Sequence, residues 1–325
     1  MNRRARRGVA LLATLWLVVA IATLTLAVAR GSRTQRLATA NAAESVRARA
    51  AAEAGIDHAV ARLARLLEDG AAAGARDPRL LLDPWAGTLA AAALDTTRIG
   101  GAAYLVRVAD AGTRLDVNAA SEAELRALLR GLRVDDAAAA RLVARLLDWR
   151  DADDDPRAGG AERAAYLDAE APVLPPNHDL ASLDDVRRLL GVDTALVSRL
   201  LPYLRVRGSA RVNVNAAPAP VLLALPGASQ PLADAVLAAR RAGRRIGSAA
   251  ELRAMLPAEA RARFDAAGAA ALGRLDFEAR ELELRAIGWV DGSPVRAGAT
   301  ALVVRAGGLP LVVWRDTHGA GEPGW

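Results

Sequence analysis

The sequence predicts an α+β fold in which a long N-terminal helix packs on a small antiparallel sheet, and a large all-α insertion interrupts the strands of that sheet. Three observations lead to this prediction. A proline-free stretch rich in helix formers follows an apolar N-terminal segment, strand-like runs occur at 102–117 and again at 277–316, and the 118–276 segment between them is helical in character. A lone two-stranded hairpin is marginally stable in water, so the two strand regions are expected to share one sheet.

The first element is an apolar segment with arginines at both ends. Residues 9–29 carry no charge, and as a helix rising about 1.5 Å per residue they span roughly 32 Å, close to the thickness of a hydrocarbon core. A secretory signal usually has a shorter apolar region, although the Ala-Val-Ala sequence at 27–29 would serve as its cleavage site. A retained transmembrane helix is therefore favoured over a removed signal.

This helix is expected to continue beyond the apolar segment. From Ser32 to Leu67 the chain has no proline and is dominated by alanine, arginine, leucine and glutamate, which are strong helix formers. An apolar stripe recurs there at helical spacing: Ile56, Val60, Leu63 and Leu67. The sequence therefore predicts one continuous rod that ends near Gly70.

Strand character appears in two regions. At 102–117, apolar residues alternate on both sides of the turn sequence DAG at 110–112, which predicts a β-hairpin. At 277–316, the turn signals DG at 291–292 and GG at 307–308 separate three apolar runs, which predicts three strands.

The segment between these regions consists of short predicted helices whose first residues are typical of helix caps. Ser121 with Glu124 and Ser248 with Glu251 have the spacing of capping boxes. The stretch LDVNAASEAELRALL from residue 115 resembles VNVNAAPAPVLLALP from residue 212. Two explanations account for this likeness equally well. One is a duplication, and the other is two independent uses of the same helix-start chemistry.

The second stretch continues into a unit that resembles a helix-hairpin-helix motif, with its hairpin at Pro226-Gly227. In DNA-binding versions, backbone amides of a Gly-x-Gly hairpin hold a phosphate group. Here the hairpin reads Gly-Ala-Ser at 227–229, so a scaffold role is favoured and no nucleic acid partner is expected. All 43 basic residues are arginines spread along an alanine-rich chain, which indicates a composition bias more than a basic patch. A membrane-anchored DNA-binding protein is the alternative.

The sequence shows no catalytic motif and predicts a protein that is not an enzyme. The histidines are scattered, cysteine is absent, and without lysine a P-loop is excluded. A secreted hydrolase whose signal is removed after Ala29 is the enzymatic alternative.

The most acidic stretch is DWRDADDDPRAGGAE at 148–162. Counted from Asp151, carboxylates occupy positions 1, 3, 5 and 12 of an EF-hand loop: Asp151, Asp153, Asp155 and Glu162. Pro156 stands where that loop normally has glycine, so an irregular ligand set is expected. These four residues are predicted to bind Ca²⁺, with Asp148 as an additional candidate. A solvated acidic turn is the alternative.

Several segments together resemble the minor pseudopilin K family of the type II secretion system. The RRG sequence at 6–8, directly before the apolar helix, resembles a prepilin leader, and three further blocks resemble that family: AAAEAGIDHAVARL, LLDWRDADDDPRAGGAERAAY, and SLDDVRRLLGVDTALVSRLLPYLRV followed by VNVNAAP. The resemblance implies that a prepilin peptidase cleaves between Gly8 and Val9 and methylates the new N-terminus. Ala13 stands where most pilins have a glutamate, which K-type pseudopilins characteristically lack.

The same resemblance implies a pilin-like architecture and a location. The expected segments are a leader at 1–8, a transmembrane helix at 9–29, a pilin-like domain at 30–117 and 277–316, an inserted helical domain with helix-hairpin-helix-like units at 118–276, and a mobile tail at 317–325. The protein would cross the bacterial inner membrane once, with its C-terminal bulk in the periplasm. It would join minor pseudopilins I and J to cap and initiate the periplasmic pseudopilus, and some family members carry calcium in the soluble region.

Overall fold

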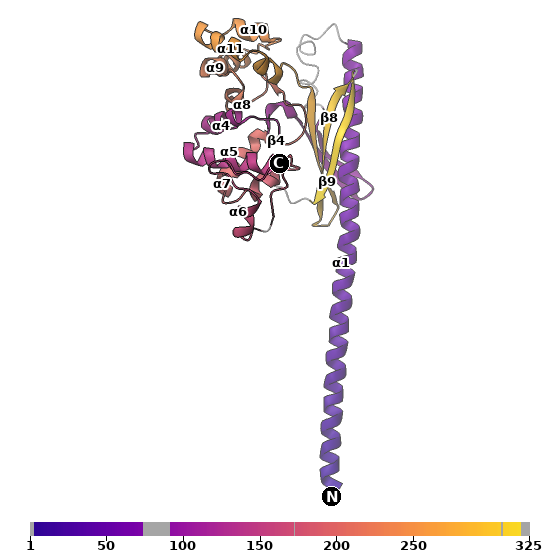
Figure 1. Ribbon diagram of the computed structural model, residues 1–325. Coiled ribbons are helices and arrows are strands. Elements are labelled where there is room, and N and C mark those ends of the chain that lie inside the picture. Colours follow the sequence, from indigo (N-terminus) through magenta and orange to yellow (C-terminus); the bar gives the residue numbers. More distant parts are fainter. Residues whose placement is uncertain (1–2, 74–91, 172, 307, 320–325) are drawn as a thin grey trace.

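The structure is a computed structural model that describes residues 3–73, 92–171, 173–306 and 308–319. In the N-terminal helix, side chains are described for residues 15–26, 30, 35–36 and 38–68. The α+β prediction is confirmed: a long helix, α1 (Arg3–Ala73), lies along a five-stranded sheet, and a helical region lies on the other side of that sheet (Figure 1).

The sheet is antiparallel throughout, in the order β1-β2-β7-β8-β9. Its strands are β1 (Leu94–Ile99), β2 (Ala102–Asp110), β7 (Glu281–Val290), β8 (Arg296–Ala306) and β9 (Leu309–Gly319). β2 pairs with β7 along its whole length, so the two strand regions do share one sheet. The glycines at 292 and 308 have positive φ angles of 77° and 87°, as the predicted turns require.

Two details of the strand prediction are wrong. Residues 102–117 do not form a hairpin, because β2 ends at Asp110, whose carboxylate accepts a hydrogen bond from the amide of Gly112 and caps a short 3₁₀ turn. That turn directs the chain into the helical region, where β3 (Leu115–Asp116) pairs with β4 (Leu204–Arg205). In addition, β9 extends to Gly319, into the segment expected to be a tail, through pairing with β8.

The C-terminal half of α1 forms a core with the sheet. The predicted stripe faces the strands: Ile56, Leu63 and Leu67 are buried and Val60 is partly buried against them. α1 also approaches β7 unusually closely, because a Cβ atom at Gly288 would overlap backbone atoms of α1. The helix continues past the predicted end at Gly70 to Ala73, and its N-terminal half extends away from the rest of the molecule (Figure 1).

The N-terminal predictions fall partly outside the described residues. Among the residues that are described, no helix combines the length and apolar character needed to cross a membrane. Part of the predicted span at 9–29 has side chains outside the described set. All side chains of the predicted leader at 1–8 are outside it.

Two consecutive helical units make up the insertion. The first unit (115–205) contains β3, α4 (Glu122–Gly131), α5 (Asp136–Arg150), α6 (Arg163–Asp168), η2 (Leu183–Arg188), α7 (Thr194–Leu200), η3 (Leu201–Tyr203) and β4. The second unit (212–276) contains β5 (Val212–Asn213), α8 (Ala219–Ala224), α9 (Gln230–Arg241), α10 (Ala249–Ala254), α11 (Ala258–Arg274) and β6 (Leu275–Asp276). In each unit the first and last short strands pair in parallel.

In each unit an asparagine at the equivalent position holds the ends of the unit together. We call the paired short strands with this asparagine the frame. In the first, the Asn118 side chain exchanges hydrogen bonds with the backbone of Leu180 and donates to the carbonyl of Val206. In the second, the Asn215 side chain makes the same three bonds, to the backbone of residues 246 and 277. The sequence likeness therefore corresponds to a structural repeat.

Candidate functional site

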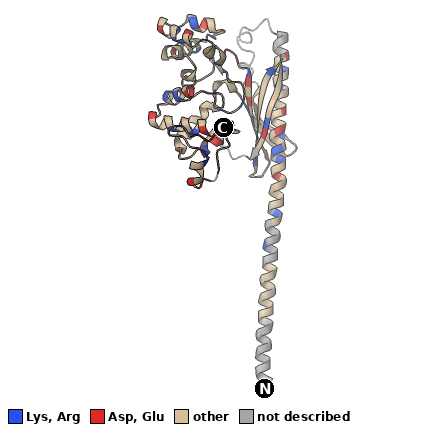
Figure 2. Cartoon of the chain, viewed as in Figure 1, with Lys and Arg blue, Asp and Glu red and all other residues tan. Residues whose placement is uncertain are grey.

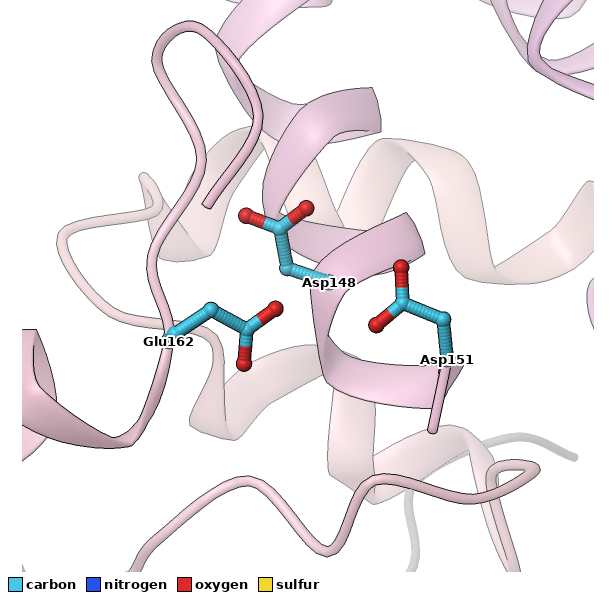
Figure 3. A group of neighbouring side chains, drawn as sticks. All are labelled: Asp148, Asp151 and Glu162. Carbon is cyan, nitrogen blue, oxygen red and sulfur yellow. The ribbon is translucent and has the colours of Figure 1, made fainter. Parts of the chain in front are cut away.

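Three carboxylates of the first unit converge at the end of α5, and we call them the acidic cluster: Asp148, Asp151 and Glu162. Each offers one oxygen that lies within 4.8 Å of the others (Figure 3). Asp148 lies in the last turn of α5 and Asp151 follows its end, so their spacing of three residues puts them on the same side of the helix. Glu162 approaches from across the loop, where it precedes the first residue of α6.

Asp148 is the most buried member of the acidic cluster and holds the loop in place. Its side chain is fully buried, and it accepts hydrogen bonds from the amide of Ala161, at 2.8 Å, and from the guanidinium of Arg157, at 2.8 Å. Arg157 also pairs with Asp151. The carboxylate of Asp148 fills the space where a Cβ atom would stand at Gly160, so the loop can pass this close only with glycine there.

Glu162 is the member whose charge is least compensated. Its side chain is 3% exposed, and among the described residues neither of its carboxylate oxygens has a hydrogen-bond partner. Burial, followed by the neighbouring charges of Asp148 and Asp151, raises the pKa of Glu162 to about 7. Asp151 also has one buried oxygen without a partner. Orphaned carboxylate oxygens of this kind are unfavourable unless a proton or a cation meets them.

The structure brings together only part of the predicted ligand set. Asp151 and Glu162 lie in the acidic cluster with the additional candidate Asp148, whereas Asp153 and Asp155 are exposed and outside it. The Asp153 carboxylate instead accepts a hydrogen bond from the amide of Asp155, at 3.0 Å. The EF-hand count begins at Asp151 and left Asp148 as an additional candidate outside the loop, because that residue belongs to the preceding helix; its spacing of three residues from Asp151 is what brings it into the cluster.

The acidic cluster fits a hard divalent cation. Carboxylate oxygens are the ligands that Ca²⁺ prefers, and here Arg157 pairs with Asp148 and Asp151 but not with Glu162. A bound Ca²⁺ would meet the orphaned oxygens and tie the end of α5 to the start of α6.

The predicted hairpin at Pro226-Gly227 connects α8 and α9, and it is packed against α11. A Cβ atom at Gly227 would lie 2.6 Å from the Cβ of Ala267 and 3.0 Å from the carbonyl oxygen of Arg263. This glycine therefore serves close packing within the second unit, and nothing in the described residues favours the DNA-binding alternative. Gly8 and Val9 lie within α1, and their side chains are outside the described residues.

Comparison with known proteins identifies the family. The family model described as "Type II secretion system (T2SS), protein K" matches residues 104–209, which include the acidic cluster. The type II secretion system protein K of Pseudomonas aeruginosa is 33% identical over 249 residues, covering 72% of this chain and 73% of that protein. The chain belongs to the type II secretion system protein K family. The resemblance seen in the sequence is thereby confirmed.

Other K-family members match over shorter segments. The proteins of Pectobacterium carotovorum and Klebsiella pneumoniae are 35% and 36% identical over 79 and 88 residues. The aligned part spans about a quarter of the length of these relatives, 24% and 27%. A solved chain of the GspK-GspI-GspJ complex from enterotoxigenic Escherichia coli covers 89% of this chain and 99% of its own length, with a TM-score of 0.58 and 18% identity. This likeness shows that the two share a fold.

Proposed function

We propose that this chain is a minor pseudopilin that caps and initiates the periplasmic pseudopilus of a type II secretion system, a structural role with no catalytic step. The observation that carries this proposal is the helical insertion, which occupies 115–276 and stands on the side of the sheet away from α1 (Figure 1). Repeated at the close spacing of a helical filament, this bulk would collide with neighbouring subunits. At the tip, it would have free space above it.

The proposed anchor is the N-terminal half of α1, with residues 9–29 in the inner membrane and the C-terminal bulk in the periplasm. The described residues 15–26 are uncharged (Figure 2). Among them Leu15, Trp16 and Leu24 expose 62%, 68% and 68% of their surface. Large apolar side chains exposed in a continuous row favour a lipid or protein environment over water.

Processing is proposed between Gly8 and Val9 by a prepilin peptidase, with methylation of the new N-terminus. The Gly8→Leu variant should keep its leader, which intact mass of the membrane-extracted protein would reveal. A mature chain that begins just after Ala29 would instead favour a removed secretory signal.

Minor pseudopilins I and J are the proposed partners, supported by the complex in which the similar solved chain occurs.

Ca²⁺ is the proposed ligand of Asp148, Asp151 and Glu162, while Asp153 and Asp155 would contribute only if the loop rearranged around the ion.

The tip position can be tested directly by immunogold labelling of assembled pseudopili. Label confined to one end is expected, and label of the major subunit along the shaft is the control. Label of this chain along the whole shaft would exclude a tip role.

A further inference from the structure

The insertion and the rest of the described chain have separate hydrophobic cores. Apolar side chains of α1 and the sheet form one core, which includes Ile56 and Leu284, and those of the insertion form a second, which includes Leu128 and Leu222. Among the described residues, the two cores share no member. Each body can therefore keep its own packing when it moves relative to the other.

Within the described residues, the chain passes between these two bodies twice, and the two crossings lie side by side. β2 leads into the insertion after Asp110, and the chain returns to the sheet at Glu281, the first residue of β7. Asp110 pairs with Leu282 in the sheet, so both crossings stand at the same end of neighbouring strands. Two adjacent crossings define a line about which a folded insertion can turn.

Charged and polar groups fill the contact between the bodies at these crossings. Three carboxylates, from the last residue of β2 and the first residues of β7, face two guanidinium groups and one amide from the insertion or the segment that leads into it. We call these six residues the ionic junction: Asp110, Glu281, Glu283, Arg114, Arg205 and Asn213.

The pair of Arg205 and Glu281 is the most enclosed contact of the ionic junction. The guanidinium donates to one carboxylate oxygen at 2.6 Å, and the other oxygen accepts from the amide of Ser209 at 2.6 Å. Gly208, whose φ is 114°, passes close to the pair: a Cβ atom there would lie 2.6 Å from Glu281 and 2.8 Å from Arg205. The segment between the two helical units is therefore fixed to the sheet through this pair.

Two further contacts complete the ionic junction. The side-chain amide of Asn213, in the second unit, donates to the carboxylate of Asp110 at 2.7 Å. Arg114, directly before the first unit, pairs with Glu283 of β7. Carboxylates of the sheet thus hold both ends of the insertion.

Beside the ionic junction, an open hollow of about 650 Å³ lies between the bodies. Trp314 of β9 lines it on the sheet side, and Asp179 lines it on the side of the insertion. Arg207 reaches across it and lies over the ring of Trp314, 4.6 Å from the centroid. An exposed cation–π contact is weak compared with the cost of breaking a buried ion pair, and the hollow leaves the insertion room to move.

We propose that the ionic junction sets the orientation of the insertion on the sheet, and that the insertion turns as a folded body about the two crossings when the carboxylates lose their partners. A guanidinium left unpaired in a buried site is strongly unfavourable, and opening the contact to water relieves it. Such opening exposes polar groups and leaves both hydrophobic cores intact, so it is easier than unfolding. The ionic junction is independent of the acidic cluster and of the position of the chain in a filament.

The test measures distances between nitroxide labels by pulsed EPR in the full-length protein in detergent. The chain has no cysteine, so labels attach only at introduced cysteines. Val46→Cys with Leu167→Cys connects α1 to the insertion, and Leu167→Cys with Leu272→Cys lies within the insertion. These three positions expose 67%, 56% and 50% of their surface, and each label pair should give one narrow distance.

The double variant Glu281→Leu, Glu283→Leu should add a second, shifted distance between α1 and the insertion and leave the distance within the insertion unchanged. Gly208→Ala keeps every charge but displaces the pair beside it, so it should cause a smaller shift of the same kind. Asp265→Asn is the matched control, because it removes an exposed ion pair with Arg253 within the second unit, and it should change neither distance.

Two outcomes would overturn the proposal. If the double variant kept a single unchanged distance between α1 and the insertion, the ionic junction would not set the orientation. If both label pairs broadened together, the junction would keep the insertion folded and would not orient it.

Discussion

The two helical units of the insertion share a frame and differ in one loop. Arg150 donates to the carbonyl of Val117 in the first unit, and Arg240 donates to the carbonyl of Val214 in the second. In the first unit, 29 residues separate Arg150 from Leu180, the residue that Asn118 holds. In the second unit, five residues separate Arg240 from Ile246, the residue that Asn215 holds.

The short loop closes through a backbone motif and through Arg245, whose guanidinium donates to the carbonyl of Phe277. After α9, Gly243 adopts a φ of 67°, and the amide of Arg244 bonds to the carbonyl of Ala239 at 2.9 Å, which is a usual way to end a helix. Two positions before Arg240 the second unit has Ala238, where the first unit has Asp148 before Arg150. The long loop of the first unit instead folds around buried carboxylates. The comparison shows that the two units share the frame, and that the acidic cluster belongs to the first unit alone among the described residues.

The largest expected effect tests the shared frame. Asn118→Ala and Asn215→Ala each remove three hydrogen bonds of 2.8–3.2 Å to backbone groups. Each should lower the free energy of unfolding by about 4 kcal/mol, because partners are left unsatisfied as well. Urea unfolding of both variants would measure this. A large loss in one variant with almost none in the other would show that the two frames are not energetically equivalent.

The next effect concerns pH and belongs to the first unit alone. In the presence of a chelator, the folded protein holds a proton on Glu162 up to its raised pKa of about 7, whereas the unfolded chain releases it near the ordinary value of 4.5. Stability should therefore fall as the pH rises from about 4.5 to about 7, by up to roughly 3 kcal/mol, and then level off.

The control for this pH effect is Glu162→Gln, which cannot titrate at that position. Subtracting its unfolding profile from that of the wild type leaves the contribution of Glu162 together with its coupling to the neighbouring carboxylates. A flat difference between pH 4.5 and 7 would contradict the burial of an uncompensated acid in the first unit.

Calcium should offset the loss of stability caused by the buried charge of Glu162. Its effect should also distinguish the acidic cluster from the EF-hand ligand set predicted from the sequence. Binding to the folded state alone stabilises it by about 2.7 kcal/mol when free Ca²⁺ is a hundred times the dissociation constant. Asp148→Asn should abolish this gain, whereas Asp153→Ala should preserve most of it, because Asp153 lies outside the acidic cluster. Thermal unfolding with Ca²⁺ and with a chelator is the measurement. An unchanged wild-type midpoint would leave the cluster as an acidic turn.

The sequence predicted the long helix and the turns of the sheet well because the signals for them are local. The stripe from Ile56 to Leu67 and the turns at 291–292 and 307–308 each depend on neighbours along the chain. The hairpin at 102–117 failed because the cap of Asp110 redirects the chain, and the partner of β3 lies far away at β4. Likewise, periodic counting could find Glu162 but could not show that it meets Asp148, since that contact depends on how the loop returns to α5.

The smallest effect compares one glycine from each loop. At Gly160 an added methyl group would overlap the carboxylate of Asp148, and this carboxylate cannot move away without losing its bonds to Ala161 and Arg157. Gly160→Ala should therefore lower the free energy of unfolding by about 2 kcal/mol, and it should also weaken any response to Ca²⁺. At Gly243 no atom lies within 4 Å of an added methyl group, and only the positive φ opposes alanine, so about 1 kcal/mol is expected without change in the Ca²⁺ response. Urea unfolding of the two variants, with and without Ca²⁺, measures both quantities. If Gly160→Ala cost no more than Gly243→Ala, the loop would not be packed on Asp148, and the first unit would close much as the second does.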